Sequence, residues 1–401
     1  MELIETRIEP AGDDRARLIG DVRYADSRAE TYWFEVPAAL EPDLSRSGNP
    51  WLTALLPLAA KLGEPLRIPL PVDRLLVRNV AELARIWRGW YPSLSEPQLD
   101  LRVCDSVVAR PPGMPARTAS FFSGGVDSFF TVLRNDEPVT GRLPIDELIP
   151  VQGFDFPLDR GEAFETHLRR LRRAADELGK AVVPVRTNLR ETRLRECSWA
   201  ELWHGAALAS VGLALERRYR HVLIASSSVY EEVEPLGSHP LTDHLLSTSA
   251  TQFVHDGAGA TRIEKTTRVA ESDVALRALH VCYREKDSEN CGRCRKCSLT
   301  IATLATLGVL DRAATFPKKV DLERVSRIYL PSPMQRRSVR RLVRLAATRR
   351  RDDLASALDK AVRTSAMRVR LLKTVRVAMP FSALSPVARR LRRAILSGAI
   401  Q

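Results

Sequence analysis

Residues 118–133 read TASFFSGGVDSFFTVL and join two apolar runs through a pair of glycines. The run at residues 118–122 is typical of a buried strand, and residues 126–133 have the composition of a buried helix. Gly124 and Gly125 allow a sharp turn and a close approach of the backbone to a ligand. The amides that follow lie at a helix N-terminus, where the helix dipole and free N–H groups favour a phosphate. The stretch therefore predicts a strand, a phosphate-binding loop and a helix.

Three polar side chains add to this loop. Ser123 and Ser128 supply hydroxyl donors, and Asp127 can brace the loop or lie near Mg²⁺. The alternative interpretation is a Gly-Gly turn followed by an ordinary Ser or Asp helix cap. A motif of five fixed residues of average abundance would occur by chance in on the order of one in a thousand chains of this length. The phosphate loop is therefore the stronger interpretation.

The sequence around this loop alternates short apolar runs with longer segments of helical periodicity. Strands are expected at residues 119–122, 148–151, 181–185 and 221–225, and helices at residues 126–133, 163–178 and 199–219. Such alternation predicts an α/β fold built on a doubly wound parallel sheet, which binds ligands at the carboxyl ends of its strands.

The sequence divides into three predicted domains. Residues 1–115 predict a small α+β domain, with strands at residues 3–8, 16–24, 31–36 and 98–103 and helices at residues 51–62 and 73–90. Residues 110–115, RPPGMP, can continue neither a helix nor a central strand and mark a boundary. Residues 116–330 form the nucleotide-binding domain, and residues 331–401 form a tail. Apolar residues at helical spacing predict tail helices at residues 334–348, 354–376 and 386–396.

Positive charge is concentrated in this tail. The whole chain has a net charge of +13, and residues 331–401 contain 18 Lys and Arg against three acidic residues. The charge is therefore a property of an appendage. Three interpretations are open: helices packed on the enzyme body with solvated arginines, a nucleic-acid-binding surface, or a surface for an anionic membrane or an acidic partner.

Four of the six cysteines lie close together in the sequence, at Cys282, Cys291, Cys294 and Cys297. Four thiolates at this spacing can close a tetrahedral Zn²⁺ site, and Gly292 relieves strain in the tight turn between two of them. An iron-sulfur cluster, disulfides and unrelated buried thiols are the alternatives. A structural zinc ion is favoured, because four protein ligands leave no open position, and such an ion supplies folding energy.

With its preceding strand, the sequence Ser-Gly-Gly-Val-Asp-Ser at residues 123–128 resembles the PP-loop of the N-type ATP pyrophosphatases. This resemblance implies an adenine nucleotide alpha-hydrolase-like fold in which ATP and Mg²⁺ bind at the loop. It also implies cleavage of ATP between its α and β phosphates, transfer of AMP to a substrate oxygen, and catalytic roles for Asp127 and Ser128. A Walker loop is not indicated, because its Gly-Lys-Ser/Thr ending is missing.

The loop and the cysteine spacing together resemble 7-cyano-7-deazaguanine synthase-like proteins, over roughly residues 118–310. That family activates a carboxylate with ATP and converts it through an amide to a nitrile. The Tyr-Pro-Asp-Cys pattern of the family's substrate loop is missing, and residues 237–244, GSHPLTDH, take its place. The chain is thus interpreted as a paralogue with a different substrate.

Candidate substrate-binding residues follow the strand expected at residues 221–225. Ser238, His239 and Asp243 lie in a loop at the ligand-bearing edge of the predicted sheet, although an ordinary surface loop is the alternative. Lys265 matches a lysine that the related proteins carry after the substrate loop, and a cation there can stabilise pyrophosphate. A solvated charge on a strand is its alternative interpretation. Two weaker candidates are His204, in an apolar helical run, and residues 255–257, HDG, which predict a turn.

The expected activity is ATP-dependent adenylation of a carboxylate or carbonyl oxygen on a small molecule, followed by attack of a nitrogen nucleophile, as in carbon-nitrogen ligases. The alternatives are a tRNA-modifying PP-loop enzyme, including a sulfur-inserting one, and a non-catalytic PP-loop scaffold. The acidic start lacks the features of a signal peptide, and no apolar run reaches the roughly 18 residues of a membrane span. A cytoplasmic location is therefore expected.

Overall fold

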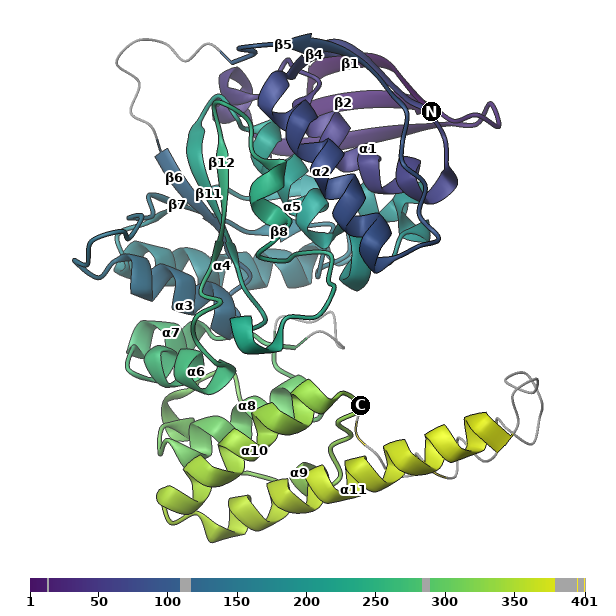
Figure 1. Cartoon of the computed structure of the whole chain (residues 1–401). Coiled ribbons are helices and arrows are strands. Elements are labelled where there is room, and N and C mark those ends of the chain that lie inside the picture. The colour runs from purple at the N-terminus through teal and green to yellow at the C-terminus, as the bar shows by residue number, and fades with distance from the viewer. Residues whose placement is uncertain (13, 109–116, 283–288, 379–394, 396–399, 401) are drawn as a thin grey trace. The chain divides into compact units, whose positions relative to one another are not determined.

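The computed structural model describes residues 1–12, 14–108, 117–282, 289–378, 395 and 400 (Figure 1). Contacts divide the chain into two compact units, Met1–Gly259 and Ala260–Gln401. The first unit holds two β-sheets and their helices, and the second is built mainly of helices in its described part. The fold is therefore α/β, as the sequence predicts.

The first unit contains a parallel sheet of five strands. They are β6 (Arg117–Phe121), β7 (Glu147–Ile149), β9 (Ala181–Val182), β11 (Tyr219–Ala225) and β12 (Gln252–Asp256). Their spatial order is β12-β11-β6-β7-β9, so the first strand in the chain lies at the centre and the order reverses between β6 and β11. All its ladders are parallel, so every strand presents its carboxyl end at the same edge.

Three of the expected helices connect these strands, namely α3 (Val126–Asn135), α4 (Gly161–Glu177) and α5 (His204–Ala214). Helix α3 contacts β6 and β11, and α5 contacts β11. Gly212 lets α5 approach the sheet closely, because a Cβ at this position would lie 2.8 Å from the Phe253 ring.

The helix expected at residues 199–219 is shorter than the sequence predicts. It starts as a π-helical turn, Trp199–Trp203, and α5 then ends at Ala214, while Tyr219 already begins β11. The reason is a buried carboxylate on β7: Glu147 accepts hydrogen bonds from Arg218 Nε (2.7 Å) and Tyr219 Oη (2.8 Å). These contacts place both residues at the start of the strand, so tertiary structure overrides the local preference.

Two of the expected strands are each divided between two sheets at a proline. Pro150 separates β7 from β8 (Val151–Gln152), and Pro184 separates β9 from β10 (Val185–Thr187). β8 and β10 belong to a second, mixed sheet. Proline has no N–H to donate to a neighbouring strand, so at each proline the chain can leave one sheet and join the other.

The mixed sheet has seven strands in the order β5-β4-β1-β2-β3-β10-β8. The N-terminal region supplies β1 (Glu2–Pro10), β2 (Arg15–Arg23), β3 (Ala29–Pro37), β4 (Leu66–Asp73) and β5 (Leu99–Cys104), with α1 (Asn49–Leu62) and α2 (Arg74–Trp90). Strand β4 was not expected, because it contains Pro69 and Pro71. The sheet takes strands from both sides of the boundary predicted at residues 110–115, and that stretch lies outside the described residues.

The second unit contains α6 (Arg262–Ala270), α7 (Asp273–Ala278), α8 (Arg295–Thr306), α9 (Leu322–Ser326), α10 (Pro333–Thr348) and α11 (Asp352–Ala378). Helices α10 and α11 confirm the first two tail helices. The third, expected at residues 386–396, lies outside the described residues apart from residue 395. No helix in the described part of the chain combines the length and the apolar content needed to cross a membrane.

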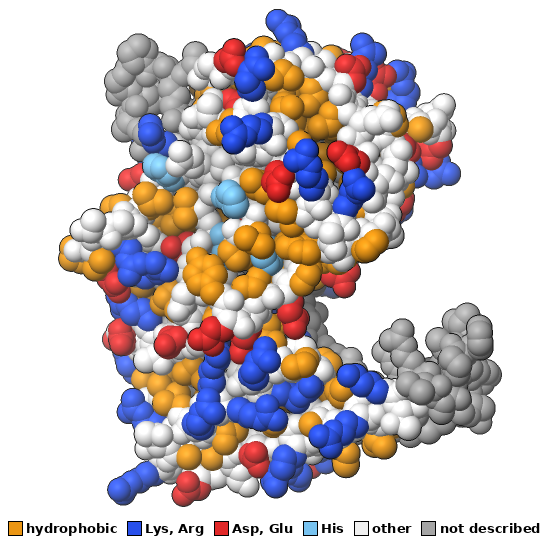
Figure 2. Space-filling view, in the orientation of Figure 1, with side chains coloured by type: hydrophobic (Ala, Val, Ile, Leu, Met, Phe, Trp, Pro, Cys, Tyr) orange, Lys and Arg blue, Asp and Glu red, His pale blue; other side chains and the backbone are white. Residues whose placement is uncertain are grey.

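The tail helices pack within their own unit. Leu342 and Ala346 of α10 are buried. Ser365 of α11 is fully buried, accepts the N–H of Leu330 (3.0 Å) and donates to the carbonyl of Ile328 (3.1 Å). Figure 2 shows Lys and Arg side chains gathered on the face of this unit that carries α8 and α10. The described helices thus fit the packing interpretation, while nucleic acid, a membrane and an acidic partner stay predictions.

Truncating a buried side chain of α11 tests whether the tail helix is part of the core. Leu358 is fully buried, so Leu358→Ala is expected to lower the free energy of unfolding by about 2–5 kcal/mol. Met367→Ala on the same helix is the control: its side chain is 56% exposed, and a change within about 0.5 kcal/mol is expected. Urea unfolding followed by circular dichroism measures both. Equal effects would contradict the packing.

Candidate functional site

The glycine loop lies where the strand order of the parallel sheet reverses. β6 leads into residues 122–125, and its neighbour β11 leads into residues 226–228 at the same edge of the sheet. In open parallel sheets, the crevice for ligands forms outside the carboxyl ends of the strands at this point. The loop between β6 and α3 therefore occupies the position at which open parallel sheets bind ligands.

The backbone of the loop requires one of its two glycines. Gly124 has a φ of 72°, in the left-handed region that side chains disfavour, and Gly125 is extended and caps α3. Helix α3 begins without a hydrogen bond from a capping side chain, so the helix-cap interpretation does not account for the loop. Ser128 Oγ instead donates back to the Gly125 carbonyl (3.1 Å), and Gly125 N–H donates to Ser123 Oγ (3.4 Å).

Two contacts from distant elements hold this loop and its helix. Asp256 at the end of β12 accepts a hydrogen bond from Thr131 Oγ1 (2.8 Å) and pairs with Arg134 (3.6 Å), so α3 is tied to the last strand. His167 of α4 places Nε2 3.1 Å from the Ser123 carbonyl, and its ring stacks on Phe156. His167 was not singled out from the sequence, because it occupies an ordinary buried position of an amphipathic helix.

A second polar cluster joins the predicted substrate loop to β12. Asp243 is fully buried, and its Oδ2 accepts from Ser238 Oγ (2.7 Å) and contacts His255 Nδ1 (2.7 Å). Its Oδ1 accepts the backbone N–H of His239 (3.0 Å). The prediction of a turn at residues 255–257 is wrong for His255 and Asp256, which are the last two residues of β12. Only Gly257, with a φ of 86°, turns the chain.

The two histidines of this cluster differ in their environment. His239 Nδ1 accepts the N–H of Leu241 (3.0 Å), and its ring packs against Trp90 at 4.7 Å between centroids. Burial, and then the charge of nearby His255, lower the pKa of His239, which favours a neutral ring. In a neutral His255 ring that donates from Nδ1 to the Asp243 carboxylate, Nε2 is the acceptor. That Nε2 is buried and has no hydrogen-bond partner among the described residues.

The four cysteines form a compact cluster in the second unit. Their Sγ atoms all lie within 4.8 Å of one another, and Cys291 and Cys297 are 3.8 Å apart. The N–H of Cys294 points at Cys291 Sγ (3.3 Å), and the N–H of Cys297 points at Cys294 Sγ (3.5 Å). None of these thiols is in a disulfide. The cluster can therefore hold a metal ion such as zinc.

Local hydrogen bonds favour a thiolate at one member of this cluster, Cys294. The hydrogen bond with Cys297 is the main factor that lowers the pKa of the Cys294 thiol to about 5, and the same contact raises the pKa of Cys297. A thiolate is the form that binds a metal. Gly292 between two of the ligands has a φ of 67°, which confirms the strain that the sequence predicts there.

Asn290 organises the cluster and was not predicted. Its side-chain oxygen accepts the N–H groups of Val281 (2.8 Å) and Cys282 (3.1 Å). Its amide nitrogen donates to the Leu279 carbonyl and the Thr315 hydroxyl, each at 2.9 Å. Asn290 thus fixes the separated Cys282 beside the other three ligands. An asparagine before a cysteine carries no such signal in the sequence, because its partners lie in two other segments, residues 279–282 and Thr315.

Lys265 differs from its expected setting, whereas His204 lies in an apolar helix as expected. Lys265 lies in α6 of the second unit and is 2% exposed, so its interpretation as a solvated charge on a strand is wrong. A buried lysine requires polar compensation. His204 begins α5, and its ring packs 4.8 Å from that of Trp199.

Comparison of the chain with models of known protein families, with characterised proteins and with solved structures gave no significant match.

Elemental analysis tests the cysteine cluster. One metal ion per chain is expected, because four thiols converge within 4.8 Å. Cys294→Ser should abolish retention of the ion and lower the melting temperature, since a structural metal contributes folding energy. Cys104→Ser is the control, because Cys104 lies in β5 of the first unit. Retention of the full complement of metal by Cys294→Ser would exclude this site.

Proposed function

We propose that the first unit is an ATP pyrophosphatase of the PP-loop type that adenylates a carboxylate or carbonyl oxygen of a small molecule. The observation that carries this proposal is the position of residues 123–128. They follow the central strand of the parallel sheet. When its five strands are numbered by their order in the chain, they lie side by side in the order 3-2-1-4-5. This order is typical of doubly wound nucleotide-binding sheets, in which the phosphates lie at the loop after the first strand.

The loop residues support this chemistry in separate ways. The backbone at Gly124 and Gly125 allows the phosphates to approach closely, and the first amides of α3 point to that region. Ser128 holds the loop through the Gly125 carbonyl. Asp127 lies in the first turn of α3, where a carboxylate can ligate Mg²⁺ beside the phosphates.

The reaction that we propose has two steps. An oxygen of the substrate attacks the α phosphorus of ATP, and the bond from that phosphorus to the bridging oxygen breaks, so that pyrophosphate leaves. A nitrogen nucleophile then attacks the activated carbon, loses a proton, and displaces AMP.

The cluster of Ser238, Asp243 and His255 is proposed as the acceptor side of the site. It lies on the loop after β11 and at the carboxyl end of β12, on the same edge of the sheet as the glycine loop. Asp243 fixes the tautomer of His255, and the acceptor Nε2 can take the proton that the nitrogen nucleophile loses. Ser238 and His239 then position the substrate.

Zinc is the proposed metal of the second unit. A tetrahedral ion with Zn–S bonds of about 2.3 Å separates its sulfurs by roughly 3.8 Å. The Cys291 and Cys297 sulfurs are 3.8 Å apart, and no pair exceeds 4.8 Å. A four-iron cluster binds each thiolate to a different iron and spreads them more widely. Four cysteines also leave no open position, so the ion is proposed to be structural.

Exchange of labelled pyrophosphate into ATP, in the presence of a panel of carboxylates, tests the proposed adenylation. Asp127→Ala and Ser128→Ala should each reduce exchange by about 10²–10³-fold, because each removes a group beside the phosphates. Asp136→Ala, at the far end of the same helix, is the matched control and should retain exchange. Formation of ADP and phosphate by the unaltered protein would contradict the pyrophosphatase assignment.

His255→Gln separates the two steps. With a carboxylate identified by the exchange assay, this variant should still exchange pyrophosphate but should form the final product about 10²–10⁴-fold more slowly, because only the second step needs the proton acceptor. Product formation and exchange are measured on the same preparation. His244→Gln is the control, since His244 is exposed and bonds only to a neighbouring carbonyl among the described residues. Equal loss of both activities would assign His255 a structural role instead.

A further inference from the structure

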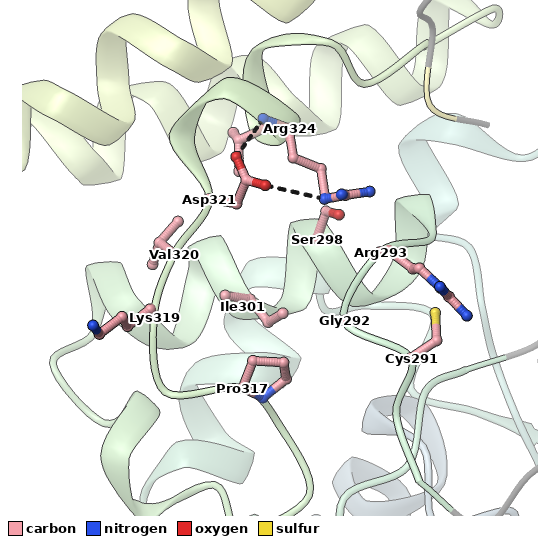
Figure 3. Close-up of a pocket in the computed structure, with 11 residues that line it drawn as sticks. Cys291, Gly292, Arg293, Ser298, Ile301, Pro317, Lys319, Val320, Asp321 and Arg324 are labelled. Carbon is pink, nitrogen blue, oxygen red and sulfur yellow. Dashed lines mark hydrogen bonds and ion pairs between the residues drawn. The ribbon is translucent and has the colours of Figure 1, made fainter.

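A pocket of about 290 Å³ lies beside the cysteine cluster, entirely within the second unit (Figure 3). Three segments form it: the turn at residues 291–293, helix α8, and residues 317–325, which lead into α9. Neither the proposed ATP chemistry nor the structural metal uses this space. Its lining divides into a polar side and an apolar side.

A buried hydroxyl marks the polar side. Ser298 of α8 lines the pocket and is 3% exposed, and its Oγ has no hydrogen-bond partner within the described part of the chain. A buried hydroxyl without a partner costs free energy, so such a group in a pocket wall indicates that a ligand completes its hydrogen bonding. In Figure 3, the Ser298 hydroxyl and the Arg324 guanidinium point into the same space.

The charged groups of the pocket differ in how far their hydrogen-bonding capacity is already used. Arg324 binds Asp321 through its Nε (3.3 Å), and Asp321 also accepts the backbone N–H of Arg324 (2.8 Å) as the cap of α9. The carboxylate is thus engaged, whereas the two terminal nitrogens of Arg324 have no partner among the described residues. Arg293, in the turn between Cys291 and Cys294, also lines the pocket, and the side chain of Lys319 points away (Figure 3).

The apolar side is formed by Ile301, Pro317, Val320 and Val325. A ligand for this pocket therefore combines an anionic group with an apolar body. The volume of about 290 Å³ is at the lower limit of small-molecule sites and suits a small ligand.

We propose that this pocket binds a small phosphate monoester, with its phosphate against Ser298, Arg324 and Arg293 and its body on the apolar wall. Three donor groups from separate segments match the three peripheral oxygens of a phosphate, and two guanidinium groups match its double charge better than a carboxylate. Arg293 also lies between metal ligands and balances their thiolate charge, so the proposal depends mainly on Ser298 and Arg324.

Binding at this place would stabilise the second unit. The ligand contacts the turn that carries Cys291 and the helix that follows Cys297, and a ligand that binds only the folded state stabilises it by mass action. The site is independent of the proposed adenylation, because all of its residues belong to the second unit.

Phenyl phosphate is the probe, and methyl resonances of the full chain are the readout. Ile301, Val320 and Val325 line the pocket and report binding there, while Val126 reports binding at the glycine loop. Saturable shifts of the three pocket methyls are expected with phenyl phosphate, and much weaker binding with phenol or benzoate. Equal affinity for phenol would mean recognition of the ring alone, and equal affinity for benzoate would mean a carboxylate site. Either result, or an absence of saturable shifts, overturns the proposal.

Two variants test the donors. Arg324→Gln should weaken phenyl phosphate binding at least about tenfold, because it removes a charge-assisted hydrogen bond, and Ser298→Ala should weaken it by about fivefold. Arg327→Gln is the matched control: it removes an exposed arginine that pairs with Glu323 outside the pocket, and affinity should stay unchanged. Metal content is measured for each protein. Unchanged affinity in Arg324→Gln with its metal retained overturns the proposal.

Discussion

A single buried carboxylate fixes the arrangement on which the first unit depends. Glu147 of β7 is fully buried and contacts Arg117 of β6 (2.7 Å) and both Arg218 and Tyr219 at the start of β11. Burial alone would raise the pKa of Glu147, but hydrogen bonds from Arg218 and Tyr219 outweigh it, and the pKa lies below its ordinary value. The carboxylate therefore stays charged, and its stabilising effect is lost only as the pH falls into the acid range.

The position of this ion pair explains why the loops after β6 and β11 leave the sheet side by side. Glu147 joins the three central strands at their amino ends, opposite the edge from which the loops leave. With β6 and β11 aligned there, the loop after β6 and the loop after β11 emerge as neighbours. Removing one partner of such a buried pair leaves an uncompensated charge and is costly, by about 3–5 kcal/mol. The geometry of the proposed site thus depends on contacts far from its chemistry.

The N-terminal region is joined to the parallel sheet more closely than a separate domain would be. At Pro150 and Pro184 the chain leaves the parallel sheet and enters the mixed sheet. Strands β8 and β10 therefore complete a sheet whose other strands come from the N-terminal region. Trp90 of α2 packs on His239, which places the N-terminal region against the proposed substrate loop. This region therefore contributes to the shape of the site, a role that composition and motif do not reveal.

The sequence by itself determined the features whose causes are local. Paired glycines between a strand and a helix predict the loop, because one of them requires a positive φ, and the spacing of four cysteines predicts a cluster of thiols, because tight turns bring them together. Tertiary structure alone decided the rest. His255 meets Asp243, Glu147 meets Arg218, and Asn290 meets Thr315 across the chain. Such partners are set by strand order and packing, which no local pattern encodes.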